Sequence, residues 1–502
     1  MNFGSILLYC SVLLLQAGLL LGDRPNIIFL LADDLGWGDV GYNGGVASTP
    51  FLNRMSKSDH SIVLTHHYSG SPVCSPTRGT ILTGRNHNRY CMWSSNTAKG
   101  DNEIDFKHPQ TMPLPTREET VAEVLREAGY RTAMYGKWHL GSLKDIVHDK
   151  KTWPKVDPGM HGFDEWYATE RTVPTANSNL GCFRNKTLSR CTNYYFKNQT
   201  SQLFPYPYPI DGDDSDFIAQ LTLDFMSEQV RKKQPFFAYV AFHAVHKPTI
   251  AVGKYKKLYI QKNYTPTEAN YYGTITAMDA AIGKIRRVLK ILGIDNNTLV
   301  WFTSDNGPAQ GNPGSTNSLM GRKGSLLEGG IRVPGLIEWP AVINENRWES
   351  YPVVTNDFLP TVRDIIKSKQ ESNLTIDGES ILPLMNKSIK NRKSPIHWMF
   401  KYPPDKRKYY QQVTIDNKYK LVQDFLKGKV QDSRLYDLNK NSGELRDIKL
   451  RHNAVFNKLQ KEAEKWKQSV MKDIKQCGNP TVETVDHEDI PHRSNLVSRN
   501  IP

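Results

Sequence analysis

The stretch Asn26-Ile-Ile-Phe-Leu-Leu-Ala32 is followed directly by Asp33-Asp34. An uninterrupted apolar run of this length is typical of a strand that is buried on both faces, as in parallel sheets covered by helices. The abrupt change to two carboxylates indicates where the strand ends. The segment therefore predicts a central strand whose carboxyl end presents Asp33 and Asp34.

Further along the chain, apolar segments of strand length alternate with helical patterns. Strands are predicted at 131–135, 236–242 and 299–303, and helices at 116–128 and 267–292. The shorter helix is expected to begin with the capping box Thr116-Arg-Glu-Glu119 and to stop at Gly129. This alternation predicts an α/β fold with a large mixed, mostly parallel sheet sandwiched by helices.

Polar clusters follow the predicted strands at four separate places in the chain. They are Asp33-Asp34, Lys137 with His139, His246, and Asp305-Asn306. In open α/β sheets, ligands bind outside the carboxyl ends of the strands. We therefore expect these four clusters to meet at one edge of the sheet.

The pattern changes beyond about residue 386. Segments 411–420 and 421–425 are predicted as antiparallel strands, and the helix after them carries apolar residues spaced by three or four: Val455, Leu459, Ala463, Trp466 and Val470. A chain of 502 residues is too long for one compact core. We expect a large domain at 23–386, a smaller α+β domain with an antiparallel sheet at 387–478, and a polar tail at 479–502.

Residues 1–22 carry no charged side chain and are rich in leucine. They predict a secretory signal peptide; the alternative, an uncleaved membrane anchor, is disfavoured because the apolar run is short for a bilayer span. No later segment is apolar enough to span a membrane, so none is expected after cleavage. Six glycosylation sequons agree with a secreted or lysosomal location: Asn185, Asn198, Asn263, Asn296, Asn373 and Asn386.

Five cysteines remain after the predicted cleavage, which is an odd number for an oxidising compartment: Cys74, Cys91, Cys182, Cys191 and Cys477. Cys182 and Cys191 could close a short loop, and Cys91 with Cys477 could join the end of the chain to its first half. These pairings would leave Cys74 alone.

The formal charge of +14 favours anionic partners. Nucleic acid is not expected, because the chain has a predicted signal peptide and no recognisable nucleic-acid-binding module. A sulfated polysaccharide is the more natural partner, and a generally basic solvated surface is an equally open interpretation.

The segment Pro72-Val-Cys74-Ser-Pro76-Thr-Arg78 precedes an apolar pair and Thr83-Gly84-Arg85. It resembles the C-x-P-x-R and T-G-R motif of the type I sulfatases, which belong to the alkaline phosphatase superfamily. In that family a dedicated formylglycine-generating enzyme oxidises the cysteine during secretion, which would account for an unpaired Cys74. The alternative is an ordinary buried cysteine.

The resemblance covers nearly the whole mature chain and makes 23–386 the catalytic domain, with an alkaline phosphatase-like fold. It implies one Ca2+ per chain. The implied ligands are Asp33, Asp34, the modified Cys74, Asp305 and Asn306. Carboxylate and amide oxygens suit calcium or magnesium better than zinc. The alternative is that Asp33 and Asp34 only cap a turn.

The resemblance also implies roles for four cationic or basic side chains around the nucleophile. Arg78 would orient the hydrated aldehyde, and His139 would assist the removal of its proton. Lys137 and Lys323 would bind sulfate oxygens and offset developing charge.

His246 would protonate the leaving oxygen, because imidazole titrates near working pH. It lies in His243-Ala-Val-His246-Lys-Pro248, so His243 is a rival for this role. His246 is favoured because it stands immediately before the x-Pro step, as in the family.

By the same resemblance, a hydroxyl of the hydrated aldehyde attacks sulfur, gives a covalent sulfo-enzyme and frees the alcohol. The substrate would be a sulfated glycan or a small aryl sulfate, and segment 168–209 could form a specificity loop. Two other functions stay open: a secreted matrix or binding protein with a sulfatase fold and little activity, and phosphoryl transfer. The superfamily's phosphoryl-transfer enzymes have Ser or Thr where this chain has Cys74, and they prefer zinc.

Overall fold

The computed structural model describes residues 24–94, 113–143, 146–148, 151–153, 155–176, 196–197, 212–369, 373–400, 409–440 and 443–476. The predicted signal peptide and polar tail lie outside these residues. So do Cys182, Cys191 and Cys477, and both predicted disulfides therefore stay predictions.

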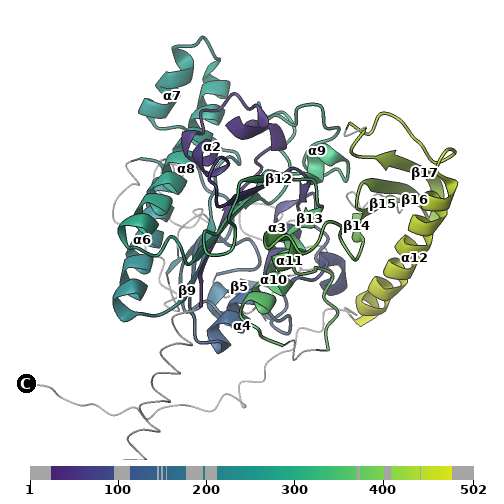
Figure 1. The fold of residues 1–502 in the computed structure, drawn as a ribbon, viewed down its shortest axis with the longest axis horizontal. Helices are drawn as coiled ribbons and strands as arrows, with labels where there is room; N and C mark the ends of the chain where they lie inside the picture. The colour runs from purple at the N-terminus through teal and green to yellow at the C-terminus, as the bar shows by residue number, and fades with distance from the viewer. Residues whose placement is uncertain are drawn as a thin grey trace, which may run out of the picture.

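A nine-stranded sheet forms the centre of the large domain (Figure 1). Its order is β12 (Arg347–Glu349), β2 (Ser61–Leu64), β11 (Gly335–Glu338), β10 (Thr298–Ser304), β1 (Asn26–Ala32), β9 (Phe236–Ala241), β4 (Arg131–Lys137), β7 (Glu165–Thr169) and β8 (Phe196–Lys197). The strands from β10 to β7 are parallel, and antiparallel pairing involves β11 and β8. The predicted mixed, mostly parallel sheet is confirmed.

Strand β1 lies in the middle of this sheet and is buried on both faces. Ile27, Phe29 and Leu31 belong to one apolar core, and the alternate residues belong to a second core on the other face. Helices α3 (Cys74–Thr83), α4 (Val121–Glu127) and α10 (Phe358–Ile365) contribute to the first core. Helices α2 (Pro50–Met55), α6 (Asp214–Lys232) and α8 (Pro266–Ile291) contribute to the second. The continuous apolar run thus reflects burial on two sides.

Helix α4 begins four residues later than the 116–119 capping box predicts. Its cap is Thr120, whose side chain accepts from the backbone N–H of Glu123, while Glu123 accepts from the backbone N–H of Thr120. The prediction was wrong because the same Thr-x-x-Glu pattern occurs twice in succession, and tertiary packing selects the second copy. Burial of Val121, Ala122 and Leu125 in the first core fixes that choice.

The smaller domain consists of one antiparallel sheet covered by a long helix, drawn in yellow-green at one side of Figure 1. Its strands are β14 (Ile396–Phe400), β15 (Tyr409–Asp416), β16 (Tyr419–Leu426) and β17 (Lys429–Asp437), and its helix is α12 (Asn453–Gln476). The predicted break between residues 420 and 421 was wrong, because the chain turns at Asn417, which adopts a φ of 52°. The predicted helix face is confirmed, since Leu459, Ala463 and Val470 are buried.

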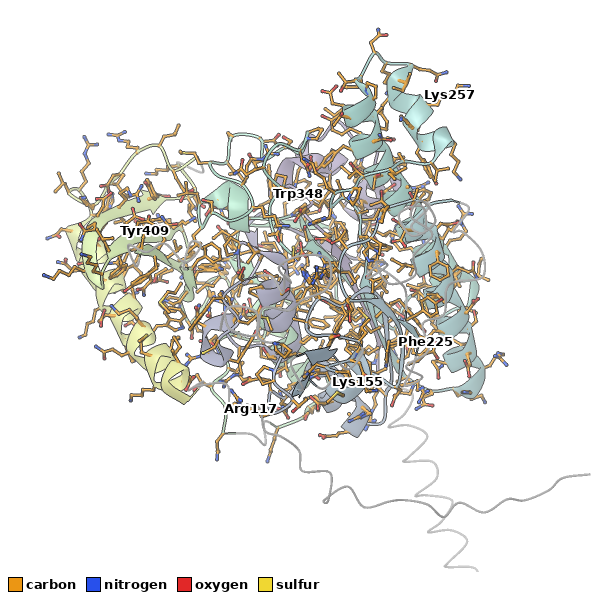
Figure 2. The ribbon with its side chains drawn as sticks, turned by 180° about the vertical axis from the view of Figure 1, so that it is seen from behind. Arg117, Lys155, Phe225, Lys257, Trp348 and Tyr409 are labelled. Carbon is orange, nitrogen blue, oxygen red and sulfur yellow. The ribbon has the colours of Figure 1, made fainter. Side chains whose placement is uncertain are left out.

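Figure 2 shows the molecule from behind, with Tyr409 in the small domain and Phe225 on α6 at opposite sides of the large sheet. The remaining elements are η1 (Trp37–Asp39), η2 (Gly41–Asn43), β3 (His67–Tyr68), η3 (His87–Tyr90), β5 (Ile146–His148), β6 (Lys151–Trp153), η5 (Pro158–His161), α7 (Gly253–Ile260), α9 (Glu328–Ile331), β13 (Val353–Val354), η7 (Thr355–Asp357) and α11 (Leu382–Met385). Within the described ranges, no helix has the length and apolar character needed to cross a membrane.

Candidate active site

The polar clusters that follow the parallel strands meet at one edge of the large sheet. Asp33 and Asp34 follow β1, Asp305 follows β10, and Lys137 is the last residue of β4. Backbone hydrogen bonds continue the sheet into these loops, from Asp33 N–H to Ala244 O (2.8 Å) and from Asp305 N–H to Ala32 O (3.1 Å). The predicted convergence is therefore present in the structure.

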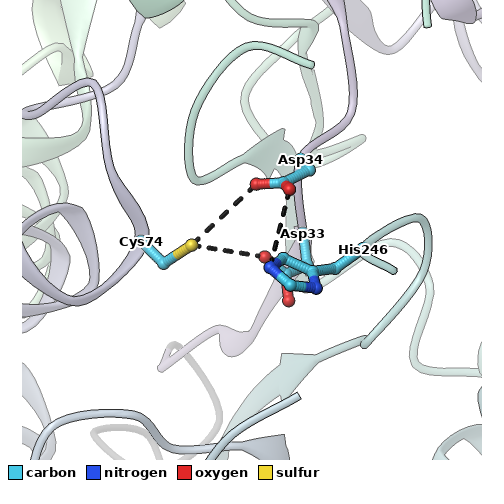
Figure 3. Close-up of side chains that lie close together, drawn as sticks. All are labelled: Asp33, Asp34, Cys74 and His246. Carbon is cyan, nitrogen blue, oxygen red and sulfur yellow. Dashed lines mark hydrogen bonds and ion pairs between the residues drawn. The ribbon is translucent and has the colours of Figure 1, made fainter. Parts of the chain in front are cut away.

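Cys74 lies at the centre of this edge, at the first residue of α3 (Figure 3). Its sulfur lies 3.6 Å from Asp33 Oδ1 and 3.9 Å from Asp34 Oδ1, and it accepts a hydrogen bond from Lys323 Nζ at 3.2 Å. Cys74 is a free cysteine in the part of the chain that the structure describes. Burial, together with the charge of Asp305, raises the pKa of the Cys74 thiol to about 12. An unmodified thiol here would be protonated and a poor nucleophile.

Asp33 is a buried carboxylate surrounded by cations. Lys137 Nζ donates to Asp33 Oδ2 at 2.6 Å, and both side chains are fully buried. Burial alone would raise the pKa of Asp33, but Lys137, His246, Arg78 and Lys323 together hold it well below its usual value. The surrounding cations therefore favour the ionised form of Asp33.

Asp34 connects Cys74 with the loop after β10. Its backbone has a φ of 63°, and its N–H donates to Asp305 Oδ1 at 3.1 Å. Its Oδ1 accepts hydrogen bonds from Asn306 Nδ2 at 2.7 Å and from Lys323 Nζ at 2.6 Å. The left-handed conformation of Asp34 thus turns the chain so that it contacts both Asp305 and Asn306.

Arg78 is fully buried and joins Asp305 to the end of β4. Its Nε and Nη2 donate to Asp305 Oδ2 at 3.1 and 2.8 Å, and its Nη1 donates to Lys137 O at 2.7 Å. Burial, with the nearby charge of Asp33, raises the pKa of Asp305 to about 6. Arg78 is one turn from Cys74 on α3, so it also fixes the direction in which the helix begins.

The two candidate histidines after β9 have different surroundings. His243 is fully buried; its Nδ1 bonds Asp214 Oδ2 at 2.6 Å, and its Nε2 bonds Thr169 Oγ1 at 2.7 Å. His246 has a side chain that is 28% exposed, and its Nε2 lies 3.7 Å from Asp34 Oδ2. His246, rather than His243, therefore faces the site and can reach a substrate.

His139 follows β4 and is nearly buried. Its backbone has a φ of 56°, and its N–H donates to Glu170 O at 3.1 Å. Burial, with the positive charges of Lys137 and Arg78, lowers the pKa of His139 well below its usual value. The surroundings of His139 therefore favour its neutral imidazole form.

The side chains at this edge fit a hard divalent cation. Ligand atoms of Asp33, Asp34, Cys74 and His246 all lie within 4.8 Å of one another. Asp34 Oδ2 and Asn306 Oδ1 are buried, and neither accepts a hydrogen bond from the described part of the chain. Buried oxygens of this kind are unfavourable unless a cation or a donor satisfies them. Asp305 differs, because both of its oxygens already accept hydrogen bonds.

Thr172 is a polar residue at the site that the sequence analysis missed. Its Oγ1 donates to Asp33 Oδ2 at 3.0 Å. It follows β7, a parallel strand of the same sheet, so the rule that located the other clusters would have located Thr172 if this strand had been recognised.

Comparisons with known proteins show the family to which the chain belongs. The family model described as Sulfatase matches residues 25–368, and the model described as N-sulphoglucosamine sulphohydrolase, C-terminal, matches residues 322–469. The N-acetylgalactosamine-6-sulfatase of Mus musculus is 32% identical over 375 residues, which cover 72% of this chain and 66% of that protein. The chain thus spans slightly less than two thirds of this relative's length.

Two solved structures share the fold over nearly the whole chain. The crystal structure of Ps i-CgsB has a TM-score of 0.74 and 25% identity, covering 91% of this chain and 98% of that one. The PsFucS1 sulfatase from Pseudoalteromonas sp. has a TM-score of 0.71 and 23% identity, covering 90% and 91%. With the family model matched over residues 25–368, these findings show that the chain belongs to the sulfatase family.

Proposed function

We propose that the protein hydrolyses sulfate esters of a sulfated glycan, with Cys74 converted to formylglycine and one Ca2+ held beside it. One observation carries the proposal: a free, buried cysteine at a helix N-terminus lies within 4 Å of two carboxylates and of a lysine amine. The name of the mouse relative, N-acetylgalactosamine-6-sulfatase, supports a sulfated sugar as substrate. Small aryl sulfates would serve as reporters.

Formylglycine and Ca2+ each have a defined place in this proposal. Formylglycine at position 74 would supply a hydrated aldehyde, which is a nucleophile toward sulfur and can afterwards release the sulfate. Ca2+ would be held by Asp33, Asp34, Asp305 and Asn306, and it would withdraw charge from the sulfate oxygens. The Ca2+ ligands and the residue roles that the family resemblance implies belong to this proposal.

The protein's own cations would bind the sulfate group. Lys323 lies against the nucleophile position, and Lys137 lies on the other side of Asp33. The N-terminus of α3 adds backbone N–H groups that favour an anion. Together they would offset the negative charge that develops on the sulfate oxygens.

Proton transfer would be divided between two histidines. As the family resemblance implies, His139 would accept a proton at the nucleophile, and His246 would donate one to the leaving oxygen. The side chain of His246 is partly exposed, which would allow a substrate to contact it.

We also propose that the protein passes through the secretory pathway to a lysosomal or extracellular location. The predicted signal peptide and sequons support this location. It is also where the formylglycine-generating enzyme would act on Cys74.

The proposal is tested by peptide mass spectrometry together with a panel of defined sulfated oligosaccharides. Protein made in cells that contain the oxidising enzyme is expected to carry formylglycine at position 74 and to release sulfate from at least one glycan. Active protein with an unmodified thiol at that position would contradict the proposal.

His246→Ala is expected to slow the hydrolysis of a sugar sulfate by about 10²-fold in kcat, because the sugar alkoxide needs a proton to leave. A nitrophenyl sulfate should lose much less, because its phenolate leaves unprotonated. The measurement is kcat on both substrates, with exposed His452→Ala as the matched control. An equal loss on both substrates would exclude the proton-donor role.

Adding Ca2+ to chelator-treated protein is expected to raise its Tm, because the ion binds only the folded site. At a free concentration 100 times Kd, the gain in the free energy of unfolding is about 2.7 kcal/mol. Asn306→Ala should reduce this gain, whereas Asp216→Asn, at a side chain that is 54% exposed, should retain it. A gain of the same size in Asn306→Ala would place the ion elsewhere.

A further inference from the structure

A lysine of the small domain is buried at its contact with the large domain. Lys420, on β16, is fully buried. Its Nζ donates to Leu326 O at 2.9 Å and to Glu328 Oε1 at 2.8 Å, and it lies 3.0 Å from Glu444 Oε1. Of the three donors of this ammonium group, two therefore make hydrogen bonds, and the carboxylate of Glu444 lies at ion-pair distance.

Two of these partners, Leu326 and Glu328, belong to the segment that follows Lys323 and leads into α9. The backbone N–H of Glu328 donates to Glu444 Oε2 at 2.7 Å, and Glu328 Oε2 accepts from Tyr68 O–H at 3.0 Å. Leu326 and Tyr68 also share an apolar cluster with Trp398 and other residues of the small domain. The small domain therefore holds this segment by its backbone and by its side chains. Figure 1 shows α9 on the side of the large domain that faces the small sheet.

The same segment carries Lys323 into the candidate active site. The backbone N–H of Lys323 donates to Pro308 O at 3.1 Å, in the loop that also carries Asp305 and Asn306. The N–H of Gly324 donates to Pro72 O at 2.9 Å, two residues before Cys74. Only two residues separate Lys323 from Leu326, so a displacement of Leu326 would move Lys323 as well.

Lys420 is a counter-ion for two buried carboxylates. The carboxylates of Glu328 and Glu444 are both buried. Lys420 Nζ lies 2.8 Å from Glu328 Oε1 and 3.0 Å from Glu444 Oε1. Arg332 contacts Glu328 only on its other oxygen, at 3.4 Å. Without Lys420, two buried carboxylates would lie close together without the cation between them, and an uncompensated buried charge of this kind is strongly destabilising.

We infer that Lys420 is a positioning residue for catalysis: by binding Leu326 O and the Glu328–Glu444 pair, it fixes the segment that presents Lys323 to the nucleophile. The small domain thereby contributes to the active site through the segment that it holds. This inference rests on the proposed function, in which Lys323 binds sulfate oxygens.

A double-mutant cycle between Lys420 and Lys323 tests the inference. Lys420→Met should lower kcat by about 10²-fold, because a displacement of about 1 Å at a reacting group has that effect. In a Lys323→Ala background, the same change should lower kcat by less than about threefold, since the group it positions is already gone. An equal loss in both backgrounds would overturn the inference.

Two further variants separate positioning from stability. Lys420→Met/Glu444→Gln removes one carboxylate with the cation, so its Tm should recover toward wild type while kcat stays low because Leu326 O lacks its donor. Lys418→Met, two residues away with a side chain 44% exposed, should leave both quantities unchanged. Full recovery of kcat in the charge-balanced variant would overturn the inference.

Amide hydrogen exchange provides a readout that does not need sulfatase activity. In Lys420→Met, residues 321–328 should lose protection, while β1 and β10 keep theirs. If the wild-type protein hydrolysed no sulfate ester, the proposed function would fall, and the exchange result would still decide whether Lys420 fixes this segment. Unchanged protection at residues 321–328 would overturn the inference.

Discussion

Cys74→Ser is expected to abolish the turnover of sulfate esters, with a loss in kcat of about 10⁴-fold or more. A serine hydroxyl at this position could accept the sulfuryl group once. It lacks the second hydroxyl of a hydrated aldehyde, so it could not release the sulfate by the same route. The site would otherwise keep its charges, because the lysines and carboxylates around position 74 are unchanged.

The measurement is a single-turnover experiment followed by mass spectrometry. Cys74→Ser should release at most one equivalent of alcohol and then carry sulfate on the peptide that contains residue 74. Wild-type chain made in cells without the oxidising enzyme serves as the control and should also be inactive, because its thiol is buried and has a pKa of about 12. Repeated turnover by Cys74→Ser would show that formylglycine is not needed.

Arg392→Met is expected to lower the free energy of unfolding by about 3–5 kcal/mol. Arg392 donates to both oxygens of Asp357, at 2.6 and 2.8 Å, and also to Pro352 O at 3.2 Å. Both charged side chains are at most 1% exposed. Without Arg392, Asp357 would be a buried carboxylate without its counter-ion, next to the chain that connects the two domains.

Urea unfolding measures this loss as a shift of the midpoint. The adjacent Lys393→Met is the matched control, because Lys393 is exposed and such substitutions change stability by less than about 0.5 kcal/mol. Arg392→Met/Asp357→Asn should recover part of the loss, since it removes the unpaired charge. A midpoint for Arg392→Met equal to that of the control would show that this ion pair contributes little.

The errors in the predicted elements have two different causes. Thr116 and Thr120 both begin a Thr-x-x-Glu pattern, and the helix begins after the one whose following apolar residues reach the core. There the local pattern allows two choices, and long-range packing selects between them. At Asn417 the signal was local and was overlooked, because Asp416-Asn417 is a turn-forming pair and Asn417 adopts the left-handed conformation between β15 and β16.

The class of fold and the edge of the sheet where the site lies could both be predicted from the amino-acid sequence. An apolar run such as 26–32 can only be stable when both of its faces are covered, and the carboxyl ends of parallel strands lie on one side of a sheet. Family membership was also visible from the Cys74 motif. These are local properties, carried by a few consecutive residues.

Which charged side chains contact one another became visible only in the folded structure. The contact between Lys323 and Asp34 spans 289 residues, and the contact between Lys420 and Leu326 spans 94. No periodicity or motif marks Lys420 or Thr172, because their roles depend on burial and on neighbours brought from other strands. The pairing of a buried charge is a property of its surroundings, and those surroundings form only when the chain folds.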